Sequence, residues 1–132
     1  MASGAPWAFV AEDDLHLADS AAIYFRSTNW IPEDADIVKP ETTFRKCHLG
    51  SDALPAPDGR TVRRLLSLHG GAGGYFLTRT AATEALALTE TVCEPADHIL
   101  FNPDFRFFSD HIVYQIDPAF AVQDLLRREN KA

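Results

Sequence analysis

The chain has 132 residues, of which 46% are hydrophobic and 23% are charged. This length accommodates one domain with a single modest core, and this composition excludes a chain that is disordered throughout. Acidic residues outnumber basic residues by 19 to 12, and the formal net charge of −7 disfavours non-specific binding to nucleic acids and to anionic lipid surfaces.

No apolar run approaches the roughly 20 residues that cross a bilayer, and the N-terminal residues show neither the basic region nor the apolar core of a signal peptide. Cys47 and Cys93 lie far apart, without a CxxC spacing or a zinc-ligand pattern. This spacing favours two free thiols in a reducing compartment, and a disulfide between them stays open. We therefore expect a soluble, cytoplasmic protein.

The first expected strand covers Trp7–Ala11 and is followed directly by Glu12, Asp13 and Asp14. Carboxylates at the end of a buried strand are typical of α/β enzymes that bind metals at the carboxyl edge of a sheet. The structural alternative is a solvated turn in which a carboxylate caps the next helix. The triplet is the first candidate for chemistry in the chain.

A helix is expected through residues 21–25, with Asp19 or Ser20 as its N-cap and with one face packed on the first strand. A short strand follows over residues 35–38 and ends at Pro40. Strand-like and helix-like segments thus alternate, which predicts an α/β fold.

Residues 41–60 have no regular period and carry closely spaced turn residues, which predicts a variable loop. A strand is expected over residues 61–68, and four of the seven glycines then fall within residues 70–74. Such a cluster indicates positive φ angles or the close approach of another group. It is neither a P-loop nor a dinucleotide-binding loop, because no Gly-Lys-Ser/Thr follows and the glycines precede a strand. A tight turn between two strands also explains it.

A strand over residues 75–77 and a helix over residues 80–91 follow the glycines, with Thr80 as the candidate cap. One helical turn is then expected over residues 96–101, and it carries Asp97. These segments continue the alternation of strands and helices.

The phenylalanines within residues 101–108 predict core or interface surface rather than a platform for sugar stacking. A last strand is expected over residues 111–116, followed by a short β-like piece over residues 119–123. Residues 124–132 are charged and are expected to form a frayed tail.

Four motifs in this order resemble those of glycosyltransferase family 25, the transferases of lipooligosaccharide biosynthesis. The motifs are Pro6 and Trp7 with the strand that ends in Glu12, Asp13 and Asp14; Gly73, Gly74, Tyr75, Phe76, Leu77, Thr78 and Arg79 with Ala81 or Ala82; Ala96, Asp97 and His98 with Leu100 and Phe101; and Val113, Tyr114 and Gln115 with Pro118, Ala119 and Gln123. The acidic triplet alone is weakly specific, whereas the four motifs together are fairly specific. The resemblance covers nearly the whole chain.

The resemblance implies a partial A-type fold of nucleotide-diphospho-sugar transferases, an α/β fold with a mixed sheet flanked by helices. It implies an inverting, metal-dependent transfer of a hexose such as galactose from a nucleotide diphosphate donor, a UDP-hexose, to a lipooligosaccharide or another glycan. Mn²⁺ or Mg²⁺ is the implied cofactor, because a hard divalent cation absorbs the charge that gathers on a diphosphate leaving group. It also implies proximity to a membrane surface without a transmembrane segment.

On this resemblance Asp14 is the favoured metal ligand, Glu12 supports it directly or through water, and Asp13 points to the other face and fixes the loop. Asp97 is the candidate general base that takes the proton of the acceptor hydroxyl. Its structural alternative is to cap the short helix that follows it.

The resemblance assigns four residues to donor binding. They are Gly73, Gly74, Tyr75 and Arg79. For Arg79, a solvated side chain at a helix start is the alternative to a contact with a donor phosphate. For His98 and His111, a packed or hydrogen-bonded role is favoured over a ligand role.

Family members begin with a strand and helices that build much of the nucleotide pocket, whereas here the acidic triplet starts at residue 12. We therefore expect residues 1–132 to form a single family 25-like domain without this N-terminal nucleotide-binding unit. A sheet that lacks its opening βαβ unit exposes a strand edge and an apolar face, which predicts a homodimer or a higher assembly. A single monomeric species in light scattering would contradict this expectation.

Two other functions stay open on the sequence. One is a non-catalytic remnant that binds a partner or a glycan. The other is a metal-dependent phosphohydrolase that uses the same carboxylates to activate water.

Overall fold

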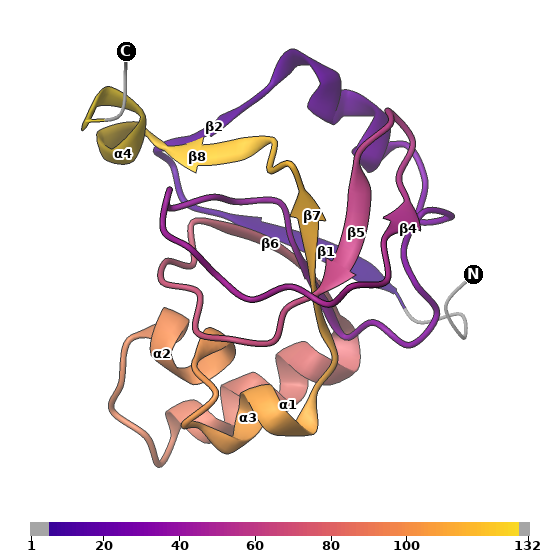
Figure 1. Ribbon diagram of the computed structural model, residues 1–132. Coiled ribbons are helices and arrows are strands. Elements are labelled where there is room, and N and C mark those ends of the chain that lie inside the picture. Colours follow the sequence, from indigo (N-terminus) through magenta and orange to yellow (C-terminus); the bar gives the residue numbers. More distant parts are fainter. Residues whose placement is uncertain (1–5, 130–132) are drawn as a thin grey trace.

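The structure is a computed structural model and describes residues 6–129 of the chain. Its elements are β1 (Trp7–Ala11), β2 (Leu15–Leu17), the 3₁₀ helix η1 (Asp19–Phe25), β3 (Ile37–Lys39), β4 (Leu54–Pro55), β5 (Thr61–Arg64), β6 (Gly74–Thr78), α1 (Arg79–Thr89), α2 (Ala96–Phe101), α3 (Arg106–Asp110), β7 (Val113–Asp117), β8 (Ala121–Gln123) and α4 (Asp124–Glu129). Six strands form one sheet in the order β1-β6-β3-β7-β5-β4, and β2 pairs with β8 in a second sheet (Figure 1). In the large sheet β3 and β7 are parallel and the other neighbours are antiparallel. The predicted mixed α/β fold with flanking helices is confirmed.

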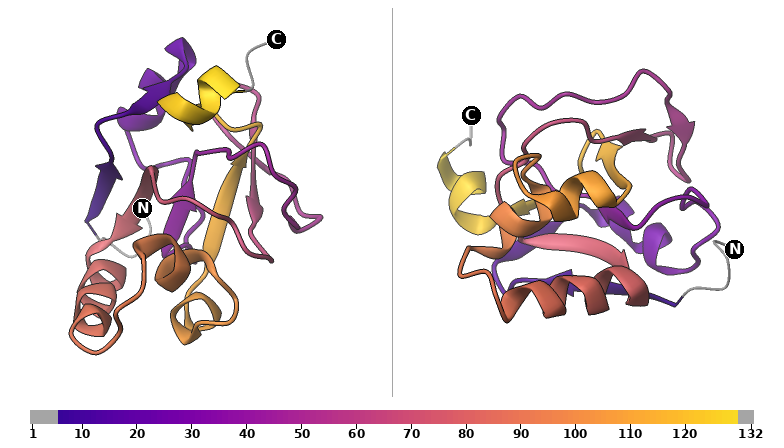
Figure 2. Two further views of the ribbon diagram at one scale, coloured as in Figure 1. Left: turned by 90° about the vertical axis from the view of Figure 1, so that its left-hand side faces the viewer. Right: turned by 90° about the horizontal axis from the view of Figure 1, so that it is seen from below.

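One face of the large sheet packs against α1, α2 and α3, which gather on one side of the molecule in Figure 1 and in the left view of Figure 2. Strand side chains alternate between the two faces, so Ile37, Leu77 and Val113 all pack on this side with Phe101 of α2. Lys39 follows Ile37 on the same face. Its ammonium lies 3.8 Å from the centroid of the Phe101 ring. A charged group therefore lies inside the layer between sheet and helices.

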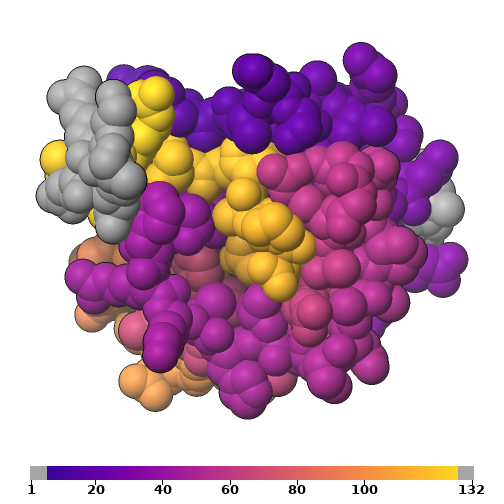
Figure 3. All heavy atoms as spheres, turned by 45° about the horizontal axis from the view of Figure 1, so that its top comes forward, coloured from indigo at the N-terminus to yellow at the C-terminus, as the bar shows by residue number. Residues whose placement is uncertain are grey.

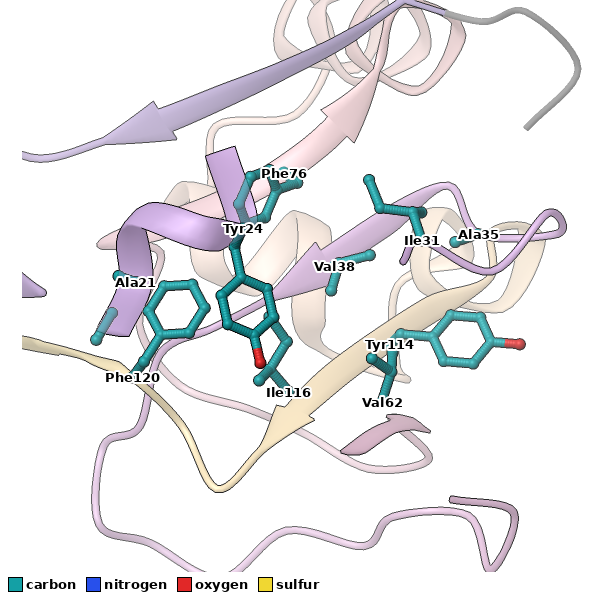
Figure 4. Close-up of a cluster of buried hydrophobic side chains, with 11 residues drawn as sticks. Ala21, Tyr24, Ile31, Ala35, Val38, Val62, Phe76, Tyr114, Ile116 and Phe120 are labelled. Carbon is teal, nitrogen blue, oxygen red and sulfur yellow. The ribbon is translucent and has the colours of Figure 1, made fainter. Parts of the chain in front are cut away.

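The opposite face of the sheet carries a second apolar cluster, in which Val38, Phe76 and Ile116 pack with residues from outside the sheet (Figure 4). Tyr24 of η1 covers these strands, and its ring centroid lies 4.7 Å from that of Phe120. Both faces of the sheet are thus buried, which explains why the central strands are apolar without alternation.

The segment η1 packs on β1 as predicted, since the ring centroids of Phe25 and Phe9 are 4.9 Å apart. It is a 3₁₀ helix, and no side chain caps it, so the prediction that Asp19 or Ser20 acts as the N-cap was wrong. The Ser20 hydroxyl instead accepts a hydrogen bond from Arg60 at 3.1 Å. A tertiary contact has taken the group that a local cap would use.

The helix α1 begins directly where β6 ends. The hydroxyl of Thr78 accepts a hydrogen bond from the Ala81 N–H at 3.1 Å, so Thr78 is the N-cap and the prediction of Thr80 was wrong. Without an intervening loop, β6 fixes both the start and the direction of α1.

Two short helices appear where the sequence predicted none. The helix α3 buries Phe107, which is 3% exposed. The helix α4 lies in the stretch that was expected to be a frayed tail, and its first N–H, from Asp124, donates to the Asp14 carbonyl oxygen at 2.9 Å. The last residues of the expected tail, 130–132, lie outside the described part of the chain.

The strand β1 is an edge of the large sheet, with β6 as its one neighbour there. An apolar groove of about 340 Å³ lies between these strands and the helices α1 and α2, and its lining includes Val10 and Leu86. These side chains are 41% and 68% exposed. The strand edge and apolar face expected from the sequence are present, and self-association through them stays a prediction. Among the helices of residues 6–129, none has the length and apolarity needed to span a membrane.

Candidate functional site

The acidic turn after β1 lies against the glycine turn, residues 70–74, that leads into β6. The Glu12 N–H donates to the Gly73 carbonyl oxygen at 2.8 Å. A carboxylate oxygen of Glu12 accepts a hydrogen bond from Gln123 Nε2 at 2.6 Å. Motifs that are far apart in the sequence therefore meet at one end of the sheet.

The side chains of the acidic turn differ in their surroundings. Asp14 Oδ1 is buried and receives no hydrogen bond from any described residue, whereas Glu12 and Asp13 are exposed. No group of three or more His, Cys, Asp or Glu side chains in residues 6–129 could hold a metal ion by itself. Mg²⁺ commonly binds through one or two carboxylates together with substrate phosphates. The unpartnered Oδ1 of Asp14 is the observation that bears on such a site, and the assignment of Asp14 and Glu12 as metal ligands stays a prediction.

Gly73 and Gly74 are buried, and close packing explains why neither has a side chain. A Cβ on Gly73 would lie 2.6 Å from a carboxylate oxygen of Glu41 and 2.8 Å from Gln123 Cγ. A Cβ on Gly74 would lie 2.5 Å from Leu15 Cδ2. Both glycines therefore allow neighbouring segments to approach β6, and this packing gives no support to the predicted role in donor binding.

The other two predicted donor-binding residues, Tyr75 and Arg79, lie in and after β6. The Tyr75 ring is half-buried and packs edge-on against Phe101, with 5.6 Å between ring centroids, and burial raises the pKa of its hydroxyl. Arg79 is exposed at the far end of β6. At about 3.3 Å per strand residue, roughly 16 Å separate Arg79 from Gly74. The structure therefore does not bring Arg79 and the glycines together.

Asp97 lies on the other side of the glycine turn, in the first turn of α2. Its Oδ2 accepts a hydrogen bond from the Gly71 N–H at 3.1 Å. No side chain caps α2, which has Pro95 at its N-cap position, so the capping alternative for Asp97 is excluded. The hydrogen bond orients a partly exposed carboxylate and leaves its Oδ1 without a partner among the described residues.

Beneath the glycine turn lies a buried network of Lys39, Glu41 and His69, none of which is more than 6% exposed. The Lys39 ammonium donates to the Gly71 carbonyl oxygen and to His69 Nδ1, both at 2.7 Å. It also lies 3.7 Å from the Glu41 carboxylate, which accepts the Gly73 N–H at 3.1 Å. These side chains thus hold a carbonyl and an amide of the turn from below.

Burial shifts the pKa of all three side chains. Burial lowers the pKa of Lys39 to about 8 and raises the pKa of Glu41, and in both cases the charge of the partner opposes the shift. Burial and the Lys39 ammonium lower the pKa of His69 to about 4, so the ring is neutral at pH 7. With Nδ1 accepting from Lys39, the ring carries its hydrogen on Nε2, which donates to the Glu41 carbonyl oxygen at 3.2 Å. At neutral pH a neutral imidazole therefore lies beside the buried Lys39 and Glu41 side chains.

Little in the sequence pointed to this network. The predicted strand stopped at residue 38, and the polar segment after Pro40 was interpreted as a variable loop. The one available signal was that Lys39 continues directly from the apolar pair Ile37 and Val38. A lysine at the end of a strand is usually exposed, so this signal is weak.

Replacing His69 with glutamine is expected to reduce the loss of stability on acidification. Because the folded pKa of about 4 lies below the ordinary value of 6.5, the unfolded chain binds more protons between these pH values, and stability falls as the pH is lowered through them. The contribution is ~3 kcal/mol at about 1.4 kcal/mol per pKa unit. Glutamine keeps a donor and an acceptor but does not titrate. Urea unfolding of both proteins, at neutral pH and at the acid end of this window, measures the difference, and parallel pH profiles would contradict it.

A hollow of about 350 Å³ opens beside the glycine turn. Its walls are formed by residues 43 and 45–47, by residues 68–71, and by Gln123 with Leu126. At one side it reaches Gly71, which is bonded to Asp97, and at another it reaches Gln123, which is bonded to Glu12. Glu12 and Asp97 are each hydrogen-bonded to a wall residue, and neither of them lines the hollow itself.

The remaining candidates have structural roles. His98 is exposed, with a nitrogen 3.5 Å from the Glu94 carboxylate. The His111 ring stacks on Phe107 at 3.9 Å between centroids. Phe101 and Phe107 are buried in the core, as predicted. Two cysteines are free thiols, Cys47 in the wall of the hollow and Cys93 at the surface.

The model of one protein family, described as glycosyltransferase family 25 (LPS biosynthesis protein), matches residues 1–100. The match covers more than half of the chain and includes the acidic turn, the glycine turn and Asp97. The chain belongs to glycosyltransferase family 25. The resemblance noted from the sequence motifs is confirmed.

Several bacterial relatives of this family 25 chain are similar to it over most of its length. Lacto-N-neotetraose biosynthesis glycosyltransferase LgtB of Neisseria meningitidis is 32% identical, over 92% of this chain and 47% of the relative. Lipooligosaccharide biosynthesis proteins lex-1 and lic2B of Haemophilus influenzae are 25% and 27% identical, over 93% and 90% of this chain and 44% and 46% of the relatives. The chain spans about half the length of the curated relatives it matches.

Proposed function

We propose that this chain transfers a hexose, such as galactose, from a nucleotide diphosphate donor to a glycan acceptor, with inversion at the anomeric carbon. Membership of family 25 supports the class of reaction. The observation that carries the proposal is the hollow beside the glycine turn, since its walls are bonded to Glu12 on one side and to Asp97 on the other.

In this reaction the acceptor hydroxyl oxygen bonds to the anomeric carbon while the bond from that carbon to the diphosphate oxygen breaks. The nucleoside diphosphate leaves, and Asp97 takes the hydroxyl proton as general base. The hydrogen bond from Gly71 to Oδ2 supports this role, because it orients the carboxylate and leaves Oδ1 for the acceptor.

Asp14, supported by Glu12, is the proposed ligand of Mn²⁺ or Mg²⁺. The unpartnered Oδ1 of Asp14 supports this assignment. When bound, such an ion supplies positive charge that stabilises the departing diphosphate. Asp13, which is exposed, is left with the role of shaping the loop.

The proposed donor is a UDP-hexose, and the proposed acceptor is a lipooligosaccharide or a related glycan. The names of the relatives, which refer to lacto-N-neotetraose and lipooligosaccharide biosynthesis, support a glycan acceptor. We place the reaction in the cytoplasm, which the two free thiols favour.

The test is a transfer assay with the purified chain, UDP-galactose, Mn²⁺ and an oligosaccharide acceptor, read out by mass spectrometry of the glycan. We expect a product heavier by one hexose that is lost with a chelator. In Asp14→Ala the rate should fall about 10²-fold or more, because metal charge contributes several kcal/mol. Asp19→Ala is the control, since this exposed carboxylate lies outside the site.

The two other functions give different results in the same experiment. Release of inorganic phosphate without an acceptor would favour a phosphohydrolase. No binding of metal or nucleotide diphosphate at millimolar concentration would favour a non-catalytic binding module.

A further inference from the structure

The hollow beside the glycine turn combines cationic side chains with open space next to a glycine. Arg45 and Lys46 contribute to one wall, and Gly70 and Gly71 contribute to the wall opposite. Gly70 has no heavy atom within 4 Å of the position of a Cβ, so this part of the turn faces open space. In Figure 1 the two segments run on the left, below β8 and α4 and above α2.

Within the described residues, the two cations of the hollow have no other partner. Arg45 and Lys46 are exposed, and no hydrogen bond or ion pair within residues 6–129 occupies either side chain. The chain as a whole carries a net charge of −7, so two adjacent unpaired cations in a hollow are a local exception. No Asp or Glu side chain is among the described residues that line the hollow.

The wall that carries the cations is anchored at both ends. At one end the Thr42 N–H donates to the Ala121 carbonyl oxygen at 3.0 Å. At the other end the Leu66 N–H donates to the His48 carbonyl oxygen at 2.8 Å. In Figure 3 the purple atoms of this segment stand at the surface beside yellow atoms of the C-terminal part. The cations therefore project from a fixed segment, which lowers the entropy cost of binding a ligand.

We propose that this hollow is a binding site for a phosphate-bearing ligand, with Arg45 and Lys46 as its charged contacts. Guanidinium and ammonium groups bind phosphate oxygens through charge-assisted hydrogen bonds. Identifying the ligand as the diphosphate of the sugar donor rests on the proposed function, whereas the phosphate site itself does not. A phosphate on the acceptor glycan is the other source of the same chemistry.

The test is calorimetric titration of the purified full chain with inorganic pyrophosphate, UDP and glucose 6-phosphate. We expect the double variant Arg45→Gln/Lys46→Gln to weaken binding at least tenfold, because it removes both charge-assisted contacts to the phosphate oxygens. Arg26→Gln/Arg106→Gln is the matched control, since it removes the same charge from exposed positions outside the hollow. Tighter binding of pyrophosphate and UDP than of glucose 6-phosphate would assign the site to the donor, and the reverse order would assign it to a phosphorylated acceptor.

Gly70→Leu tests the hollow by volume rather than by charge. The open space at Gly70 and its ordinary φ indicate that the fold accepts this side chain, which unchanged thermal unfolding would verify. Because the leucine side chain would fill this space, we expect Gly70→Leu to lose binding of whichever of the three probes the wild type binds most tightly. Wild-type affinity in the Arg45/Lys46 double variant, or no binding of any of the three probes by the wild type, would overturn the phosphate site. If the wild type binds the phosphate probes but transfers no hexose, the phosphate site stands and the proposed function is contradicted.

Discussion

Replacing Asp97 with asparagine is expected to lower kcat for sugar transfer by about 10²–10⁴-fold, the usual contribution of a general base. The amide oxygen of asparagine can still accept the Gly71 N–H, so the glycine turn should keep its position. Only the ability to take the acceptor proton is lost. Stopped assays at saturating donor and acceptor, together with thermal unfolding, measure both quantities.

The control for this substitution is Asp104→Asn, which alters an exposed carboxylate on the turn before α3. We expect it to keep the wild-type rate. Asp97→Ala also removes the acceptor of the Gly71 N–H. If only this variant has a lower melting temperature than the wild type, the hydrogen bond from Gly71 stabilises the glycine turn. A rate for Asp97→Asn within about threefold of the wild type would exclude Asp97 as the base.

Replacing Lys39 with methionine is expected to lower the free energy of unfolding by ~3–5 kcal/mol, the usual cost of breaking a buried ion pair. The substitution leaves the Glu41 carboxylate buried without its counter-charge, and it removes the donor to the Gly71 carbonyl. Small domains have total stabilities of about 5–15 kcal/mol, so this single change approaches the limit for folding. Urea unfolding monitored by circular dichroism measures it.

The double variant Lys39→Met/Glu41→Gln separates charge from packing. With both charges removed, we expect part of the lost stability to return, because no uncompensated ion stays buried. If the single variant does not fold, a folded double variant still shows that the uncompensated charge of Glu41 caused the loss of stability. Lys46→Met is the matched control at an exposed position, where the change should stay within about 0.5 kcal/mol. Equal losses in the single and double variants would contradict a role for the charge pair.

Local patterns predicted the elements that carry the expected chemistry. An apolar run followed by carboxylates defined β1 and the acidic turn, and the glycine cluster defined the turn before β6. The short helix with Asp97 was also predicted, at the bounds that α2 has in the structure. These features could be predicted because turns and short helices are determined mainly by residues that are adjacent in the sequence.

The length of a strand bears on two predictions that residue type left open. A complete strand lies between Gly73 and Arg79, and a donor contact of Arg79 stays a prediction. Thr78 and Thr80 are equally good caps by residue type, and the end of β6 decided between them. In both cases the length of a strand, and not its composition, was the missing information.

The sequence by itself determined the fold class, the family and the order of the acidic turn, the glycine turn and Asp97, because each depends on short runs of adjacent residues. Only the tertiary structure decided that Lys39, Glu41 and His69 form one buried network, and that Arg45 and Lys46 face a hollow. The physical reason is that burial of a charge depends on partners distant in the sequence. A lysine next to a proline has no local mark that separates a buried ion pair from a solvated side chain.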